Sequence, residues 1–206
     1  MDNMAFHKKA WEAFFEKYRP TGMSLEDFLQ YFGRTNKDLL TILYRGGISE
    51  DQMVLLGEEK ETLYRQIYAR HIEPAPGLVG FLEVLKQNGV RMAVASAAPK
   101  VNVDFVFEHI PIRDYFAAVI DADDVTRGKP DPEIYLKAAS LIRVKPQHCV
   151  VFEDSLNGIK AAKQAGAKVI GVTTTHPAEA LEGIDMFIGD FTEISLETLS
   201  GLIPYM

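Results

Sequence analysis

The chain has 206 residues, 47% of them hydrophobic and 25% charged, which is the composition of a globular protein with one large domain or one domain carrying a smaller insert. Its 29 acidic and 22 basic residues give a net charge of −7 without any cluster of Lys and Arg, so we expect no binding to nucleic acid. No apolar run reaches the ~20 residues of a membrane span and the N-terminus lacks the features of a signal peptide, so we expect a cytoplasmic protein that does not bind membranes.

The first third of the chain has a helical pattern. Apolar residues recur every three or four positions between Phe6 and Tyr18, which predicts an amphipathic helix. Further helix starts are indicated by three candidate N-cap residues, Ser24, Thr35 and Ser49, the last of which forms a possible capping box with Gln52. We therefore expect residues 1–73 to form a small bundle of about four helices.

From residue 74 onward, short apolar runs alternate with amphipathic stretches. The runs expected to form buried parallel strands are 90–95, 117–120, 149–152, 168–172 and, more weakly, 186–188. The stretches expected to form helices between them are 78–87, 101–108, 132–142 and 158–165. This alternation predicts an α/β domain over residues 74–206, with an open parallel sheet flanked by helices on both faces. Cys149 is expected to pack in a strand rather than to act as a nucleophile.

Polar residues follow three of these apolar runs, and the carboxyl ends of parallel strands are where sites of such sheets lie. Ser96 and Ala97 follow the first run, where a hydroxyl and backbone N–H groups at a helix start could hold an anion. The alternative for Ser96 is an ordinary N-cap. Lys129 lies between Gly128 and Pro130 in the loop after the second run, either aimed inward by this loop or simply solvated.

Glu153 and Asp154 directly follow the third run, where a buried strand meets its loop. Two carboxylates at this place repel each other and lose hydration, so they need a cation, and oxygen ligands of this kind suit Mg²⁺. The alternative is that one carboxylate caps the following helix while the other faces water. The acidic residues Asp121, Asp123 and Asp124 lack the spacing of a calcium loop and are interpreted as a solvated loop.

These stretches resemble a known family. Ser96-Ala97, the segment 128–132 and the segment 150–162 followed by Ala165-Gly166 are similar, in order and spacing, to the second, third and fourth motifs of the haloacid dehalogenase-like hydrolases. The resemblance covers essentially the whole chain and is strongest to beta-phosphoglucomutases and small-molecule phosphatases with a helical cap. It implies a cap over residues 1–73 and a catalytic core over residues 74–206.

The resemblance also implies the chemistry. An Asp on the first strand of the family's core attacks phosphorus, and a second Asp two residues later acts as acid and base. By motif, Ser96 and the Ala97 N–H would hold the phosphoryl group, Lys129 would bridge phosphate and nucleophile, and Glu153 with Asp154 would bind Mg²⁺. The substrate would be a small phosphorylated metabolite of the sugar phosphate class, and we expect a monomer.

The Asp-x-Asp motif that opens the family's core is absent from this chain. The strand that carries it in the family lies in the middle of the sheet, and its loss would leave backbone groups of its neighbours unpaired. We therefore expect that the natural gene continues upstream by roughly 10–15 residues, a strand of ~5–6 residues plus its turn. The chain as written is expected to be inactive. The alternative is a truncated, non-catalytic relative that binds a phosphate ligand or a partner.

Substrate choice would come from the cap. His7 corresponds to a His on the first cap helix of the similar phosphoglucomutases, and Arg34 and Lys37 are candidates for a distal anion grip; for all three, plain exposure to solvent is the alternative. Those mutases offer a Lys-Gly pair and then Arg in the next cap segment, where this chain has Phe32, Gly33 and Asn36. Because a mutase needs a second strong phosphate grip, these changes favour a phosphatase over a mutase.

Overall fold

The computed structural model describes residues 4–31, 35–173 and 183–203, and they divide into two compact units. The helical unit contains the described residues up to Ile72, and the sheet unit contains those from Glu73 onward. Within the described residues, no helix combines the length and the apolar character that crossing a membrane requires.

The helical unit is formed by α1 (Met4–Tyr18), α2 (Leu25–Leu29), α3 (Asn36–Leu43) and α4 (Glu50–Tyr68). The three predicted N-caps are confirmed, because the side chains of Ser24, Thr35 and Ser49 each accept a hydrogen bond from the backbone N–H three residues on. The capping box of Ser49 and Gln52 is also present. Each cap satisfies an N–H group that the first helical turn leaves without an intrahelical acceptor, which fixes where these helices begin.

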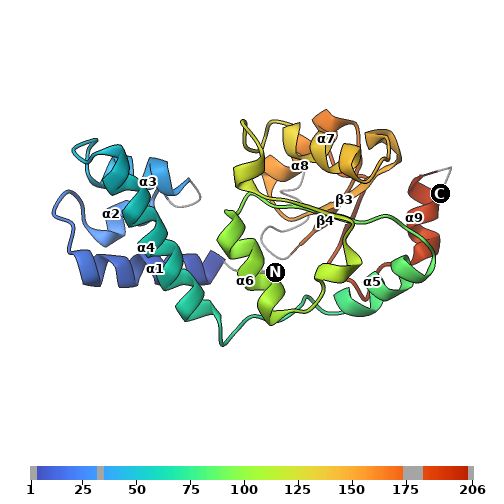
Figure 1. The fold of residues 1–206 in the computed structure, drawn as a ribbon, viewed down its shortest axis with the longest axis horizontal. Coiled ribbons are helices and arrows are strands. Elements are labelled where there is room, and N and C mark those ends of the chain that lie inside the picture. Colours follow the sequence, from blue (N-terminus) through green and yellow to red (C-terminus); the bar gives the residue numbers. More distant parts are fainter. Residues whose placement is uncertain (1–3, 32–34, 174–182, 204–206) are drawn as a thin grey trace. The chain divides into compact units, whose positions relative to one another are not determined.

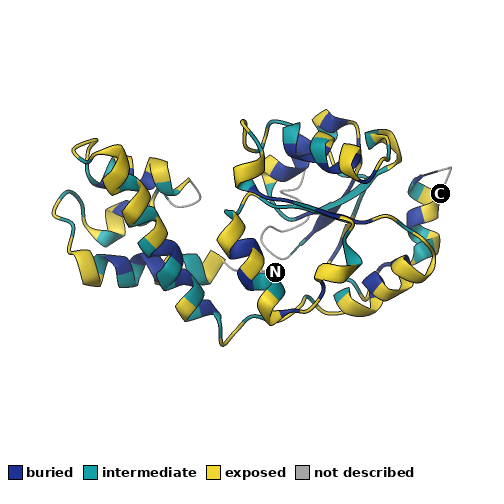
Figure 2. Cartoon of the chain, in the orientation of Figure 1, coloured by how far each residue is buried: buried dark blue, intermediate teal, exposed yellow. Residues whose placement is uncertain are grey.

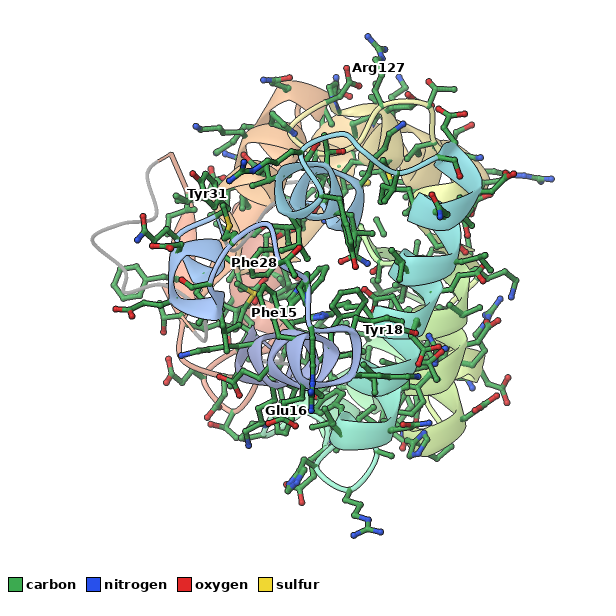
Figure 3. All side chains as sticks on the ribbon, turned by 90° about the vertical axis from the view of Figure 1, so that its left-hand side faces the viewer. Phe15, Glu16, Tyr18, Phe28, Tyr31 and Arg127 are labelled. Atoms are coloured by element: carbon green, nitrogen blue, oxygen red, sulfur yellow. The ribbon has the colours of Figure 1, made fainter. Side chains whose placement is uncertain are left out.

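Aromatic and leucine side chains form the core of the helical unit. Trp11 and Phe14 of α1 pack with Phe28 of α2, all at most 1% exposed. The Phe15 ring lies 5.0 Å from that of Phe28, and Figure 3 shows the two side chains on neighbouring helices. Burial of these large apolar surfaces holds together helices that would be too short to persist alone.

The described part of the sheet unit contains five strands: β1 (Ala93–Ala95), β2 (Ala118–Ile120), β3 (Val150–Glu153), β4 (Lys168–Val172) and β5 (Met186–Ile188). Its α-helices are α5 (Leu78–Gln87), α6 (Lys100–His109), α7 (Glu133–Leu141), α8 (Leu156–Ala165) and α9 (Leu196–Leu202), with 3₁₀ turns η1 (Arg113–Tyr115), η2 (Ala122–Asp124) and η3 (Pro146–His148). All five predicted strands are therefore found, and every pairing between them is parallel. The predicted fold class, parallel strands flanked by helices, is confirmed (Figure 1).

The strands do not form one continuous sheet. β1 pairs with β2, and separately β3, β4 and β5 pair in that order. Within the described residues no strand pairs with the second edge of β1 or with the second edge of β3. Residues 169–172 of β4 are buried, whereas the apolar residues of β1 and β3 are only half-buried (Figure 2). Apolar strands of a parallel sheet are normally covered on both faces and paired on both edges, so these two edges are unusual.

Side chains of β3 alternate between two layers of helices, as the pleat of a strand requires. Val151 packs against the cluster formed by α7, α8 and the strands. Phe152 meets Phe81 of α5, with ring centroids 5.9 Å apart, and Phe191, at 5.3 Å. In Figure 1, α7 and α8 accordingly cover one side of the strands while α5 lies on the other. This packing places the side chain of Glu153, the last residue of β3, on the same side of the strand as that of Val151.

Cys149 differs from the expectation. It is half-buried and precedes β3, at the end of η3, instead of lying within a strand. The strand begins one residue later because Val150 is the first residue in register with β4, opposite Lys168.

Candidate functional site

The carboxyl ends of β1 and β3 are joined by Lys129. The Lys129 ammonium donates to the Ala95 carbonyl oxygen at the end of β1 (3.3 Å) and to Glu153 Oε1 at the end of β3. The side chains of Lys129 and Glu153 are 11% and 8% exposed, so this is a largely buried ion pair. The loop around Lys129 therefore aims the ammonium inward, and the alternative of a solvated lysine is excluded.

Glu153 is fixed through both of its carboxylate oxygens. Oε1 accepts from Lys129 and from Tyr135 Oη (2.5 Å). Oε2 accepts from the backbone N–H groups of Asp154 and Ser155 (3.1 Å each) and from Ser155 Oγ (3.0 Å). Burial on its own would raise the pKa of the Glu153 carboxyl, but the Lys129 charge and these hydrogen bonds outweigh it and hold the pKa below its usual range. Glu153 is therefore ionised at neutral pH.

The start of α8 is built around this carboxylate. Ser155 is the N-cap, and its Oγ accepts from the Gly158 N–H (3.0 Å) while donating to Glu153. A Cβ atom at Gly158 would overlap with the Glu153 carboxyl group, so a glycine is required at this position. Neither acidic residue caps α8 itself, which was one of the alternatives for this pair.

Ser96 and Ala97 directly follow the Ala95 carbonyl that Lys129 contacts. The Ser96 N–H donates to the Ile120 carbonyl (2.9 Å), and Ser96 Oγ accepts from the Ala98 N–H (3.1 Å). A hydroxyl that accepts a bond in this way can still donate its own hydrogen. Ser96 is half-buried and Ala97 is exposed. The structure thus brings the predicted residues of the sheet unit to one place, at the ends of β1 and β3.

Asp121 corrects one interpretation. The residue is 7% exposed and its carboxylate accepts from the Asp123 N–H (2.9 Å), so it caps η2 and is not solvated. Asp123 in turn accepts from the Lys100 N–H at the start of α6. These carboxylates therefore serve the loop after β2 as local caps. Among the described residues, no group of three or more His, Cys, Asp or Glu side chains is placed to hold a metal ion.

The helical unit holds a buried lysine that sequence reasoning missed. Lys60 of α4 is 2% exposed, and its ammonium donates to His7 Nδ1 (2.7 Å) and to Glu61 Oε1 (2.8 Å). It also lies over the rings of Trp11 and Tyr64, at 5.7 and 5.6 Å from their centroids. Burial lowers the pKa of Lys60, and the Glu61 charge opposes part of this change.

His7 belongs to the same cluster, whereas the other predicted residues of this unit do not. The His7 ring stacks on Tyr64 with centroids 3.9 Å apart, and because its Nδ1 accepts from Lys60, its hydrogen is on Nε2. Burial, and then the Lys60 charge, lower the pKa of His7 to about 4. Lys37 is exposed in the first turn of α3, and Arg34 lies outside the described residues.

Comparison with known proteins identifies the family. Residues 2–166 match the haloacid dehalogenase-like hydrolase family. The chain belongs to this family. A solved haloacid dehalogenase-like hydrolase of family IA, variant 3, from Entamoeba histolytica is 31% identical and superposes with a TM-score of 0.87 over 97% of this chain and 92% of its own.

Curated relatives include phosphatases and a phosphomutase. Validoxylamine A 7'-phosphate phosphatase from Streptomyces hygroscopicus subsp. limoneus is 41% identical over 118 residues, which are 57% of this chain and 55% of that protein. Beta-phosphoglucomutase from Bacillus subtilis (strain 168) is 28% identical over 207 residues, or 96% of this chain and 88% of that protein. The chain spans only about half the length of the first curated relatives that it matches. The chain is therefore related to proteins that are named for reactions of small phosphorylated molecules.

Substitution of Lys129 tests how much the buried ion pair contributes to stability. Lys129→Met should lower the free energy of unfolding by roughly 3 kcal/mol, because Glu153 would remain buried without its counter-charge. The double variant Lys129→Met, Glu153→Gln should regain most of this loss. Urea unfolding measures both, with Lys100→Met, which breaks an exposed pair with Asp104, as the control that should change little. A single variant as stable as wild type would contradict a paired, buried Glu153.

Gly158 offers a second test. Gly158→Ala should destabilise the protein by about 1–3 kcal/mol, since the new methyl group must displace the Glu153 carboxyl from its donors. Gly80→Ala in α5 is the matched control, because open space surrounds a Cβ there and alanine favours a helix by about 0.5–1 kcal/mol. In thermal and urea unfolding, the midpoint should fall for Gly158→Ala and rise for Gly80→Ala. Equal effects would show that Glu153 does not occupy the space beside Gly158.

The His7 cluster predicts a pH dependence of stability. In the unfolded chain His7 takes up a proton near its ordinary pKa of 6.5, whereas the folded protein resists protonation until about pH 4. Stability from this group is therefore complete above pH 6.5 and is lost as the pH falls towards 4. His7→Phe keeps an aromatic ring on Tyr64 but removes the titrating group, so the urea midpoint of unfolding should depend less on pH between 6.5 and 4 than in wild type. His148→Phe, at an exposed position, should leave this pH dependence unchanged. An unchanged slope in His7→Phe would show that His7 is accessible to protons in the folded state.

Proposed function

We propose that this hydrolase is a Mg²⁺-dependent phosphatase acting on a small phosphorylated metabolite of the sugar phosphate class. The observation that supports the proposal is the position of the Lys129 ammonium, which contacts the Ala95 carbonyl at the end of β1 and Glu153 at the end of β3, the residues that directly precede Ser96 and Asp154. A phosphate ester repels any anionic nucleophile, so a site that cleaves it needs fixed positive charge. We also propose that the protein acts as a monomer, since the residues assigned to the phosphate all belong to one sheet unit.

Each residue takes a definite task in the proposal. Ser96 and the Ala97 N–H donate to the phosphoryl oxygens, and Lys129 neutralises their charge. Asp154, half-buried at the start of the loop, offers the carboxylate oxygen that Mg²⁺ prefers. Glu153 completes the acidic pair, but its five hydrogen bonds favour a main task of anchoring Lys129. When bound, the metal would draw electron density from the phosphoryl oxygens and make phosphorus easier to attack.

The nucleophile must come from a carboxylate beyond these residues. We propose that it is carried by a strand paired with the open edges of β1 and β3, which would bring its carboxyl end beside Lys129. A carboxylate oxygen on that strand attacks phosphorus, the bond to the substrate oxygen breaks, and an adjacent acid protonates the leaving alkoxide. Water, deprotonated by the same group, then attacks phosphorus of the acyl phosphate and releases inorganic phosphate.

A phosphomutase is the second candidate, since the match to beta-phosphoglucomutase covers 96% of this chain. One contact in the helical unit favours a phosphatase over a mutase. Asn36, which takes the position of the mutases' arginine in the resemblance, donates to Glu61 Oε1 (2.6 Å) and is therefore tied to the Lys60 cluster. An amide held in this way cannot replace a guanidinium as the second phosphate grip.

Release of phosphate from a panel of sugar phosphates and an aryl phosphate tests the proposal. The 206-residue chain should release no phosphate. A chain extended at its N-terminus by an apolar strand that ends in Asp-x-Asp should release phosphate in the presence of Mg²⁺, and addition of EDTA should stop this release. The same extension with Asn-x-Asn is the matched control and should be inactive.

Each other outcome has a clear meaning. Turnover by the unextended chain would mean that another group is the nucleophile. Phosphate binding without turnover by either chain would favour a non-catalytic binding protein. Transfer between two positions of one sugar, with little free phosphate, would favour the mutase.

A further inference from the structure

Tyr135 of α7 contacts both members of the ion pair at the site, although no sequence motif pointed to it. Its side chain is buried, with 8% of the residue exposed. Its hydroxyl lies 2.5 Å from Glu153 Oε1, and its ring centroid lies 4.8 Å from Lys129 Nζ. One residue thus donates to the anion and offers the negative face of its ring to the cation.

The Lys129 ammonium is held from three directions by three different elements. It has three N–H donors, and among the described residues two of them have acceptors, the Ala95 carbonyl of β1 and Glu153 Oε1 of β3. The Tyr135 ring of α7 limits its movement on a further side. An ammonium fixed in this way can present its third N–H in one direction.

The Tyr135 hydroxyl also fixes the carboxylate oxygen to which the lysine is bound. Oε2 of Glu153 is filled by the donors at the start of α8, so Oε1 alone faces the lysine. Tyr135 and Lys129 share this one oxygen. Burial, and then the Glu153 charge, raise the pKa of the Tyr135 phenol, so it stays a neutral donor. Without the hydroxyl, Oε1 would lose the donor from α7 that helps to fix its position and would be held by the ammonium alone.

We propose that Tyr135 is a positioning residue, which holds the Lys129 ammonium between Glu153 and the aromatic ring so that one N–H remains directed to an oxyanion of the phosphate ester class. The inference rests on the proposed function, because it concerns the same phosphate site. Tyr135 acts only through Lys129 and Glu153 and does not itself contact the substrate.

Two variants of the full chain separate the parts played by the hydroxyl and the ring. Tyr135→Phe removes the hydroxyl and keeps the ring, and Tyr135→Leu removes both. The structure offers a matched control on its surface: Tyr115 donates to Glu83 (3.4 Å) and lies under Lys86, whose ammonium is 5.0 Å from the ring centroid. Tyr115→Phe therefore makes the same chemical change in a similar trio away from the site.

The first readout needs no phosphate. In wild type, the ring current of Tyr135 should move the NMR resonances of the Lys129 ε-protons upfield. Tyr135→Phe should keep the upfield shift of the ε-protons but change the position of the Lys129 Nζ resonance. Tyr135→Leu should abolish the upfield shift. A wild-type Lys129 without a ring-current shift, or a Lys129 Nζ resonance unchanged in Tyr135→Phe, would overturn the inference.

The second readout is the dissociation constant for inorganic phosphate in the presence of Mg²⁺. Tyr135→Phe should weaken binding about tenfold, because a displaced Lys129 would lose one hydrogen bond to the anion, whereas Tyr115→Phe should leave binding unchanged. Equal affinities in wild type and Tyr135→Phe, or an equal loss in Tyr115→Phe, would overturn the inference. If wild type takes up no phosphate, the proposed function fails, and the Lys129 resonances decide the positioning role by themselves.

Discussion

The ion pair of Lys129 and Glu153 is the contact on which the arrangement of the sheet unit depends. Taking two charges out of water costs several kcal/mol per ion unless they pair well and their remaining hydrogen-bonding atoms are satisfied. The structure meets this condition with donors from Tyr135 and from the start of α8, and with an acceptor at the end of β1. Because those partners belong to different elements, the pair also fixes the ends of β1 and β3 relative to each other.

The divided sheet gives this pair its functional meaning. β1 and β3 are linked at their carboxyl ends by Lys129, yet each keeps one edge without a described strand. Backbone groups on such edges are satisfied only by water or by another strand. A strand that paired with both edges would end beside the lysine, and a carboxylate there would face a phosphate across a fixed positive charge. The carboxyl ends of β1 and β3 at Lys129 therefore decide both where a further strand could pair and where the proposed reaction would take place.

Much of the fold could be predicted from residue patterns, because each pattern reflects a local physical rule. The apolar runs became strands, and the hydroxyl residues before acidic turns became N-caps. Glu153 was expected to follow its strand, but it is the last residue of β3, since its backbone still pairs opposite Gly171. Asp121 was expected in water, whereas its carboxylate caps a turn, which a count of acidic residues does not reveal.

The site was only partly predictable. Residues that follow the buried strands of a parallel sheet gather at its carboxyl edge, so it could be expected from the sequence that Lys129 would lie near Glu153 and the end of β1. The role of Tyr135 could not be expected, because it depends on the packing of α7 over β3, which no local pattern encodes. A signal did exist for Lys60: Leu56, Lys60, Tyr64 and Tyr68 follow at intervals of four on α4, so a lysine stands within an otherwise apolar stripe of the helix.

A crystal structure of the protein soaked with tungstate, a phosphate analogue visible by anomalous scattering, and Mg²⁺ would test the central claim most directly. We expect an anomalous peak from a tungstate whose oxygens lie within hydrogen-bond distance of Lys129 Nζ and Ser96 Oγ, with Glu153 still bound to the lysine. Tungstate bound elsewhere, with these residues free of anion at saturating concentration, would contradict it.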